Sequence, residues 1–134
     1  MKICFVIPTY NEHGNINRLI EKINAIARKN SYNYEIIVVD DNSFDGTIQD
    51  VENLQKFQNN IKLIKRKRLM GIGTAHIEGY NNADGDLIIS MDADLSHPPE
   101  KIPDFVLKIK NGYDMVMSSR YIPGGATEKK LSIP

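Results

Sequence analysis

The stretch D-L-I-I-S-M-D-A-D-L-S-H-P-P, from Asp86 to Pro99, decides the fold class of this chain. Leu87 to Met91 is a short apolar run, which is typical of a buried parallel strand. Asp92 and Asp94 follow it directly, and open α/β sheets bind ligands at the carboxyl ends of their strands. Because alternate residues of an extended segment share one side, we expect both carboxylates to face one site, with Ala93 turned away. In this context the pair favours a divalent metal site over two solvated loop aspartates.

Apolar runs and segments with helical spacing alternate along the chain. We expect an N-cap at Asn15 for the first helix, a cap at Thr47 or Asp45 for the second, and Gly71 at the start of the third. Alternation at this short spacing implies right-handed βαβ crossovers. It predicts one α/β domain over residues 1–134, with a Rossmann-like, mostly parallel sheet and helices on both faces in a three-layer α/β/α arrangement. The expected strands are residues 3–7, 35–39, 61–64, 87–91 and 113–117, and a fourth helix begins at Pro99 or Glu100.

The composition argues against several other classes of protein. The 134 residues carry 17 Lys and Arg against 17 Asp and Glu, so no net charge indicates a nucleic-acid partner. The single cysteine, Cys4, excludes an internal disulfide and suits a reducing compartment. No apolar run reaches the roughly 18 residues of a membrane span, and the apolar segment from Lys2 to Pro8 is too short for a signal peptide. We therefore expect a globular, cytoplasmic protein.

Four polar clusters follow predicted strands, at residues 9–12, 40–45, 92–97 and 118–120, and the topology should bring them to one crevice. Arg120 is a candidate to meet a phosphate there, whereas the basic run from Lys65 to Arg68 is better explained as a solvated strand end. Gly71-Ile72-Gly73 lacks the third glycine of a dinucleotide-binding fingerprint. The three histidines are too dispersed for a zinc site. His97 has either a structural role in the Pro-Pro turn or a role behind a metal ligand.

Six motifs occur in the order found in the family 2 glycosyltransferases of the GT-A fold, and they span nearly the whole chain. The chain therefore resembles that family, and within it the dolichol-phosphate mannose synthase group. The motifs are V-I-P-T-Y-N-E (Val6 to Glu12), V-V-D-D-N-S-F-D-G-T (Val38 to Thr47), G-I-G-T-A-H-I-E-G (Gly71 to Gly79), A-D-G-D (Ala83 to Asp86), M-D-A-D-L-S-H-P-P (Met91 to Pro99) and S-R-Y-I-P-G-G (Ser119 to Gly125).

The resemblance implies a role for each candidate site residue. Asp92 and Asp94, with Ser96 as a further contact, would hold Mg²⁺ or Mn²⁺ on the donor diphosphate. Ser96 stands where many relatives have a longer glutamine, and Leu69 stands where relatives usually have a lysine. Asp94 and Arg120 would be catalytic, Arg120 by contacting the diphosphate. The nucleotide-binding residues that the resemblance implies are Pro8, Tyr10, Glu12, Asp41 and Asp92.

The implied reaction transfers a hexose, in the first place mannose from GDP-mannose, with inversion onto dolichyl or polyprenyl phosphate. Two alternatives stay open: a nucleotide-sugar-binding chain without turnover, and an undecaprenyl-phosphate glycosyltransferase that uses a UDP-sugar. Relatives continue past Pro134, so we expect residues 1–134 to be the donor domain without the acceptor part. The expected location is cytoplasmic, including the cytoplasmic face of a membrane, and the expected partners besides the two substrates are a membrane subunit or a second copy of the chain.

Overall fold

The computed structural model describes residues 1–117, so Arg120 and the cluster at residues 118–120 lie outside the described part of the chain. The chain divides into two compact units, residues 1–101 and 102–134. The first contains the whole sheet, and the second begins with the helix α4, Ile102–Lys110. Within residues 1–117, no helix is both long enough and apolar enough to cross a lipid bilayer.

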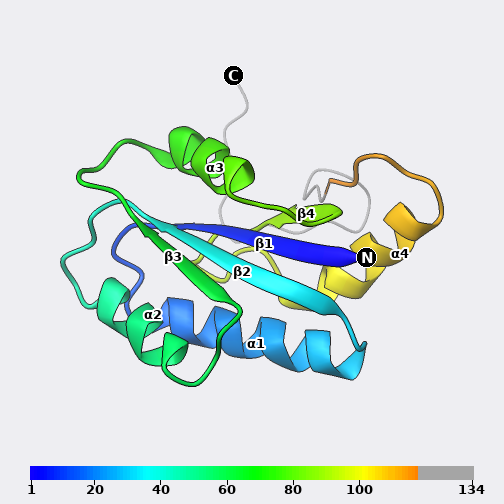
Figure 1. Ribbon diagram of the computed structural model, residues 1–134, viewed down its shortest axis with the longest axis horizontal. Helices are drawn as coiled ribbons and strands as arrows, with labels where there is room; N and C mark the ends of the chain where they lie inside the picture. Colours follow the sequence, from blue (N-terminus) through cyan, green and yellow to red (C-terminus); the bar gives the residue numbers. More distant parts are fainter. Residues whose placement is uncertain (118–134) are drawn as a thin grey trace, which may run out of the picture. The chain divides into compact units, whose positions relative to one another are not determined.

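The first unit is built on a four-stranded parallel sheet in the order β3-β2-β1-β4 (Figure 1). The ends of each strand lie within two residues of the ends of an expected apolar run, so the predicted strands at these positions are confirmed. In register, Thr9 pairs with Asp40 and Asp40 pairs with Lys65, so three strands end level with one another. The strands are β1 (Lys2–Thr9), β2 (Asn33–Asp40), β3 (Ile61–Lys65) and β4 (Leu87–Ser90).

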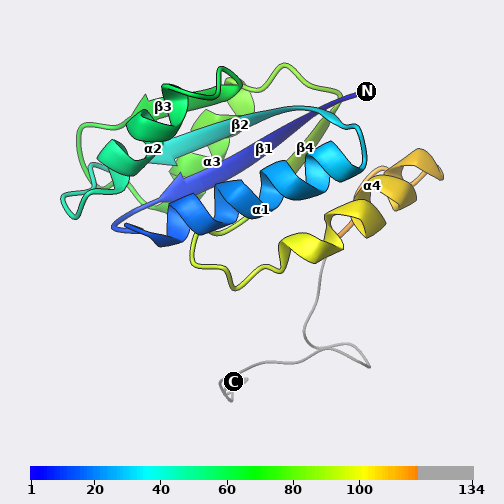
Figure 2. The same ribbon diagram turned by 90° about the horizontal axis from the view of Figure 1, so that it is seen from below.

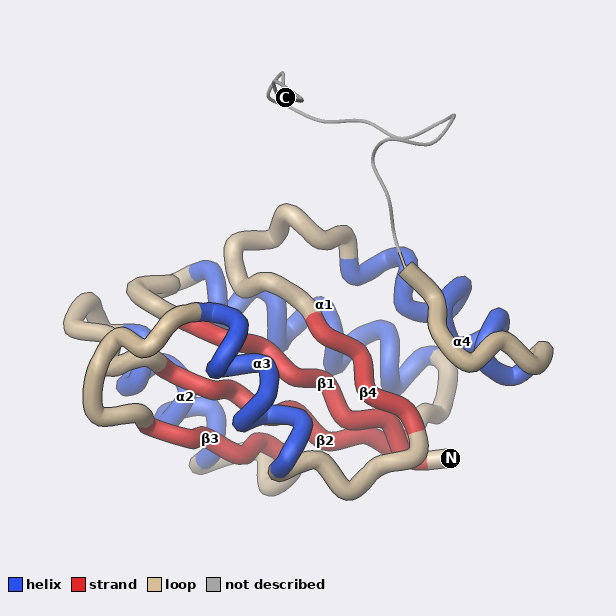
Figure 3. Tube along the Cα trace, turned by 90° about the horizontal axis from the view of Figure 1, so that it is seen from above, coloured by secondary structure: helices blue, strands red, loops and turns tan. Residues whose placement is uncertain are grey.

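Helices cover both faces of this sheet, which confirms the predicted three-layer α/β/α architecture. The helices α1 (Asn15–Lys29) and α2 (Thr47–Gln55) lie on one face (Figure 2), and α3 (Ile72–Asn81) lies on the other (Figure 3). The predicted helix at Pro99 begins as a 3-10 turn, Pro99–Lys101, and continues into α4.

Strand alternation divides the core between the two faces. Cys4 and Val6 of β1 pack with Ile37 and Val39 of β2 and with Ala75 of α3. The intervening residues of β1 and β2 therefore face α1, and the hydroxyl of Tyr34 accordingly donates a hydrogen bond to the α1 residue Asn24 over 2.7 Å. The buried residues of α1 are Ile16, Leu19, Ile20, Ile23, Asn24 and Ala27, whose helical spacing was visible in the sequence.

The predicted strand at Tyr113 to Met117 is wrong, because these residues have no strand structure. Alternating apolar residues form a strand only where a neighbouring strand accepts their backbone hydrogen bonds and covers their side chains. Here the side chains of Tyr113, Met115 and Met117 are 63%, 77% and 80% exposed.

The predicted N-caps are also wrong, because both helices start after a glycine with a positive φ. Gly14 (φ 80°) precedes α1, so Asn15 is the first helical residue, and its side chain donates to Glu12 Oε2. Gly46 (φ 108°) precedes α2, and neither cap position makes a side-chain hydrogen bond. Asp45 instead accepts hydrogen bonds from the backbone N–H and the hydroxyl of Thr47 through Oδ1. Glycine is favoured at these two positions because L side chains are strained at positive φ.

We expect Gly79→Ala to destabilise the chain. A Cβ at Gly79 would lie 2.3 Å from Val6 Cγ1 and 3.3 Å from Val39 Cγ2, so α3 would have to move off the sheet. Such overpacking costs about 1–3 kcal/mol. Gly73→Ala, in the same helix and with nothing within 4 Å of its Cβ, is the matched control and should be neutral or stabilise by up to about 1 kcal/mol. Urea denaturation followed by circular dichroism measures both; equal midpoints would contradict the close packing.

We expect Asp45 to make stability depend on pH in the acid range. Burial alone would raise the pKa of Asp45, but hydrogen bonds from the Thr47 hydroxyl and from the His13 and Thr47 N–H groups hold the pKa below its ordinary 3.8. A lowered pKa stabilises the fold fully above the unfolded value, and this stabilisation is lost as pH falls through the folded value. The difference in Tm between the parent and Asp45→Asn should therefore be constant near neutral pH and shrink below pH 3.8. A difference that does not change with pH would contradict this assignment.

Candidate functional site

An open pocket of about 250 Å³ lies at the carboxyl ends of the strands. Its walls come from the loops after β1, β2 and β4 and from the segment that leads into α3, which is where the topology predicts a ligand site. Four carboxylates lie along it, on a background of small and apolar side chains. The lining residues are Pro8, Thr9, Tyr10, Glu12, Asp41, Leu69, Ile72, Ala75, Asp92, Ala93 and Asp94.

The end of β2 ties these loops together through Asp40, which is fully buried. Its carboxylate accepts hydrogen bonds from the Thr9 hydroxyl over 2.7 Å and from the Ser43 N–H and hydroxyl over 2.8 Å and 2.6 Å. Backbone bonds continue the link, from Asp41 N–H to Thr9 O and from Arg66 N–H to Asp40 O. Asp40 is therefore a structural residue, and the next residue, Asp41, is the one that faces the pocket.

The loop after β1 presents Tyr10 and Glu12 to the pocket. Asn11 (φ 52°) fixes this loop, since its N–H donates to Ser43 Oγ over 2.8 Å and its Oδ1 accepts from the Phe44 N–H over 3.0 Å. Tyr10 is 41% exposed and packs edge-on against Phe44, with ring centroids 6.3 Å apart. The exposed ring offers a flat apolar surface beside the carboxylates, which suits the base of a nucleotide.

The residues after β4 form a turn and not an extended segment. The strand ends at Ser90, a turn starts at Ala93, and Leu95 has a φ of 66°. Because of this turn, Ala93 also lines the pocket between Asp92 and Asp94, so the expectation that it turns away is wrong. The two carboxylates meet at one pocket through the turn and not through strand alternation.

Hydrogen bonds hold the Asp94 carboxylate and the Asp92 backbone in this turn. The Ser96 hydroxyl, followed by its N–H, lowers the pKa of Asp94, and that N–H donates to Asp94 Oδ1 over 3.0 Å. The Asp92 N–H donates to His97 Nδ1 over 3.1 Å, and His97 Nε2 lies 3.6 Å from Asp92 Oδ2. His97 thus supports the position of Asp92. Ser96 is exposed and does not line the pocket; it contacts the pocket residue Asp94.

The donor set of Asp92 and Asp94 fits a hard divalent cation. Carboxylate oxygens are the ligands that Mg²⁺ and Mn²⁺ prefer, and Mg²⁺ is commonly bound by one or two carboxylates together with substrate phosphates. Among residues 1–117, no three Asp, Glu, His or Cys side chains are grouped closely enough to hold a metal by themselves. Besides these two carboxylates, water and the phosphate oxygens of a bound substrate are the usual further ligands of such a metal.

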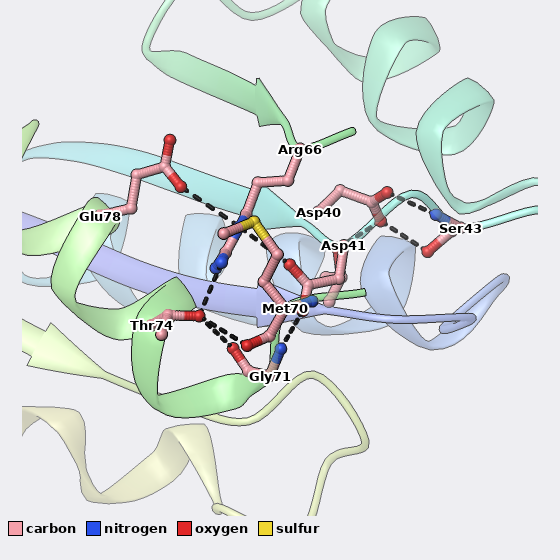
Figure 4. A network of polar contacts seen from close by, with 9 residues as sticks. Asp40, Asp41, Ser43, Arg66, Met70, Gly71, Thr74 and Glu78 are labelled. Carbon is pink, nitrogen blue, oxygen red and sulfur yellow. Dashed lines mark hydrogen bonds and ion pairs between the residues drawn. The ribbon is translucent and has the colours of Figure 1, made fainter. Parts of the chain in front are cut away.

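A buried arginine lies beside the pocket, and the sequence interpretation missed it. The Arg66 side chain is 3% exposed; its Nε lies 3.1 Å from Asp41 Oδ1 and 3.3 Å from Glu78 Oε2 (Figure 4). Its Nη2 donates to Thr74 Oγ1 over 2.6 Å. Period-two spacing could have found it, because residue 66 falls on the same face as Ile64, which packs on the core beneath α3. The neighbours Lys65, Lys67 and Arg68 are exposed, as a solvated strand end predicts.

Relatives and solved structures of similar sequence and shape agree with this geometry. The chain is 44% identical over 128 residues to a dolichol-phosphate mannosyltransferase of Pyrococcus furiosus, covering 96% of this chain and 36% of the relative. It is 38% identical over 120 residues to an undecaprenyl-phosphate 4-deoxy-4-formamido-L-arabinose transferase of Proteus mirabilis, covering 89% of this chain and 37% of the relative. The chain thus spans little more than a third of the length of these relatives.

Among solved structures, S. aureus TarS 1–349 matches with a TM-score of 0.66 and 28% identity over 83% of this chain and 33% of its own. The mannosyltransferase PcManGT from Pyrobaculum calidifontis, solved with GDP-Man and Mn²⁺, matches with a TM-score of 0.60 and 26% identity over 69% of this chain and 27% of its own. The model of the family Glycosyl transferase family 2 matches residues 4–132. The parallel sheet, the pocket at its carboxyl edge and this match agree, and the chain belongs to glycosyltransferase family 2.

Proposed function

We propose that this chain binds a nucleotide-sugar donor, GDP-mannose in the first place, for the transfer of mannose with inversion onto dolichyl or another polyprenyl phosphate. The observation that carries this proposal is the 44% identity to a dolichol-phosphate mannosyltransferase over 96% of the chain. The pocket supports it, because the loop after β1 offers the ring of Tyr10 and the turn after β4 offers two carboxylates. A nucleoside diphosphate needs both kinds of contact, an apolar surface for its base and a cation site for its diphosphate.

In this proposal Pro8, Tyr10, Glu12 and Asp41 form the nucleoside end of the pocket, and Asp92 and Asp94 hold Mg²⁺ or Mn²⁺ at the other end. The bound metal would neutralise charge on the departing nucleotide diphosphate. The hydrogen bonds from Ser96 lower the pKa of Asp94 and so favour the ionised form that binds a metal. The acceptor is a phosphate, whose oxygen is already ionised near neutral pH, so the chemistry requires no strong general base. Arg120 remains the proposed contact to the diphosphate.

A second candidate is an undecaprenyl-phosphate glycosyltransferase that uses a UDP-sugar. It is favoured by the 38% identity to the Proteus mirabilis transferase. Both candidate functions use a metal at the turn with Asp92 and Asp94 and a lipid phosphate as the acceptor. They differ in the base and the sugar of the donor nucleotide. A direct comparison of GDP-mannose with UDP-sugars therefore separates them.

The transfer assay tests the proposed function as a whole. The protein is incubated with GDP-mannose, Mn²⁺ and a short polyprenyl phosphate, and the lipid fraction is examined for mannose and for its anomeric configuration. We expect residues 1–134 to bind GDP-mannose with Mn²⁺, and we expect transfer with inversion from a chain that also has the acceptor part. Binding of GDP-mannose without transfer by that longer chain would favour a nucleotide-sugar-binding role, and failure to bind any sugar nucleotide would contradict the proposal.

We expect Asp94→Asn to abolish the Mn²⁺-dependent part of GDP-mannose binding and to leave the fold intact. The amide is a neutral and weaker ligand for a hard cation, and Asp94 is exposed at the surface of the turn. Titration calorimetry with and without Mn²⁺ measures the effect. Glu21→Gln, the same chemical change on an exposed residue of α1, is the control. Equal Mn²⁺-dependent affinity for GDP-mannose in Asp94→Asn and the parent would contradict the proposed metal site.

A further inference from the structure

Phe44 is an apolar side chain that stays exposed at the carboxyl edge of the sheet. It lies in the loop after β2, and 81% of it is accessible to solvent. Its one aromatic contact within residues 1–117 is with Tyr10, whose ring centroid lies 6.3 Å away at an interplanar angle of 74°. Aromatic pairs with this geometry attract one another beyond the area that they bury. Single exposed apolar residues are common on proteins, so the exposure alone assigns no role to Phe44.

What distinguishes Phe44 is that its backbone is fixed to the loop that carries Tyr10. The Phe44 N–H donates to Asn11 Oδ1 over 3.0 Å, and the Asn11 N–H donates in the other direction to Ser43 Oγ over 2.8 Å. The hydroxyl of Ser43 is itself held by the buried carboxylate of Asp40 over 2.6 Å. The residue after Tyr10 and the residue before Phe44 are therefore joined, so the two rings stay together.

Two further hydrogen bonds join the same two loops. The Glu12 N–H donates to the Thr47 hydroxyl over 2.8 Å, and the His13 N–H donates to Asp45 Oδ2 over 3.1 Å. These bonds fix the backbone that follows Tyr10, but they do not set the side-chain torsions that orient its ring. The contact with the neighbouring phenylalanine restrains these torsions.

We propose that Phe44 is a positioning residue of the nucleotide pocket, which holds the Tyr10 ring in the orientation that receives the base. This inference rests on the proposed function, since the base of the nucleotide is the group that would lie against Tyr10. A ring that is already oriented loses less side-chain freedom when a ligand binds, so the ligand binds more tightly. Phe44 acts through Tyr10 and is not itself among the residues that line the pocket.

Nucleotide affinities, measured by titration calorimetry with Mg²⁺, test this role. Phe44→Ala should weaken GDP and UDP by roughly two- to tenfold, which is the range expected for the loss of one aromatic pair. It should leave the affinity for inorganic pyrophosphate unchanged, because pyrophosphate has no base. Phe44→Tyr keeps a ring at this position and should restore the affinities of the parent.

Phe57 provides a matched control. It is 91% exposed and lies between α2 and β3, at the opposite edge of the sheet from the pocket. Phe57→Ala therefore removes a similarly exposed ring without touching Tyr10, and it should bind GDP and UDP like the parent. Equal affinity of Phe44→Ala and the parent for both nucleotides would overturn the positioning role, and so would an equal loss in the two alanine variants.

A double-mutant cycle separates positioning from direct contact with the ligand. In the Tyr10→Ala background, the further change Phe44→Ala should cause no additional loss of GDP affinity, because the ring that Phe44 orients is no longer present. An additional loss as large as that in the parent background would show that Phe44 contacts the nucleotide itself, which overturns the inference.

The ring of Tyr10 gives a second readout, in the absence of any ligand. In a chain with isotope-labelled tyrosine rings, the NMR signals of Tyr10 are assigned by comparison with Tyr10→Phe. They should move toward those of a free tyrosine in Phe44→Ala and stay in place in Phe57→Ala. Unchanged signals in Phe44→Ala would overturn the claim that Phe44 orients this ring.

The two readouts distinguish failure of this inference from failure of the proposed function. If the parent binds neither GDP nor UDP, the proposed function fails and the nucleotide part of the inference fails with it. The Tyr10 signals then still decide whether Phe44 orients the ring. If the parent binds both nucleotides and Phe44→Ala binds them equally well, only the inference about Phe44 fails.

Discussion

Two consecutive buried aspartates at the end of β2 hold the carboxyl edge of the sheet together. A buried carboxylate is costly unless it is hydrogen-bonded or paired, so each of the two requires fixed partners nearby. Asp40 takes them from the loops after β1 and β2, through Thr9 and Ser43. Asp41 takes them from the other side of the sheet, through Arg66 and the backbone before α3. Because the two side chains make their hydrogen bonds on opposite faces of the sheet, this dipeptide fixes three segments of the pocket: the loop after β1, the loop after β2 and the backbone before α3.

The charge balance of the pocket follows from this arrangement. Arg66 compensates Asp41 within the fold, whereas Glu12, Asp92 and Asp94 have no lysine or arginine partner among residues 1–117. Carboxylates that share a pocket raise one another's energy unless a cation or several hydrogen-bond donors lie among them. The pocket is therefore suited to a ligand that brings a divalent metal or many hydroxyl groups. The proposed donor, a sugar nucleotide with its metal, would bring both, and this argument rests on the local charges and not on the similarity to other proteins.

Much of the fold could be predicted from the sequence. Apolar runs such as Ile3 to Ile7 indicate buried segments, and burial decides which segments become strands. The position of the pocket followed from topology alone. The errors concern features that depend on distant partners. Residues 113–117 have the pattern of a strand without the structure of one, and the start of α1 depends on Asp50 of α2, which accepts from the Gly14 N–H. Arg66 looked like one cation in a basic run because its buried partners are separated from it in sequence.

The distribution of strained backbone connects the fold to the site. Each of the three loops that line the pocket contains a residue with positive φ: Asn11 after β1, Asn42 after β2 and Leu95 after β4. Asparagine tolerates this conformation because its short polar side chain bonds locally, as Asn11 does with Phe44. Leucine has no such compensation, and the left-handed region costs an ordinary residue roughly 1–2 kcal/mol. That cost falls on Leu95, which lies between Asp94 and Ser96. The Ser96 N–H donates a hydrogen bond to the Asp94 carboxylate and holds it in place. The strain is therefore located at the turn that presents Asp92 and Asp94, the proposed metal ligands, which is where backbone strain is commonly found in functional sites.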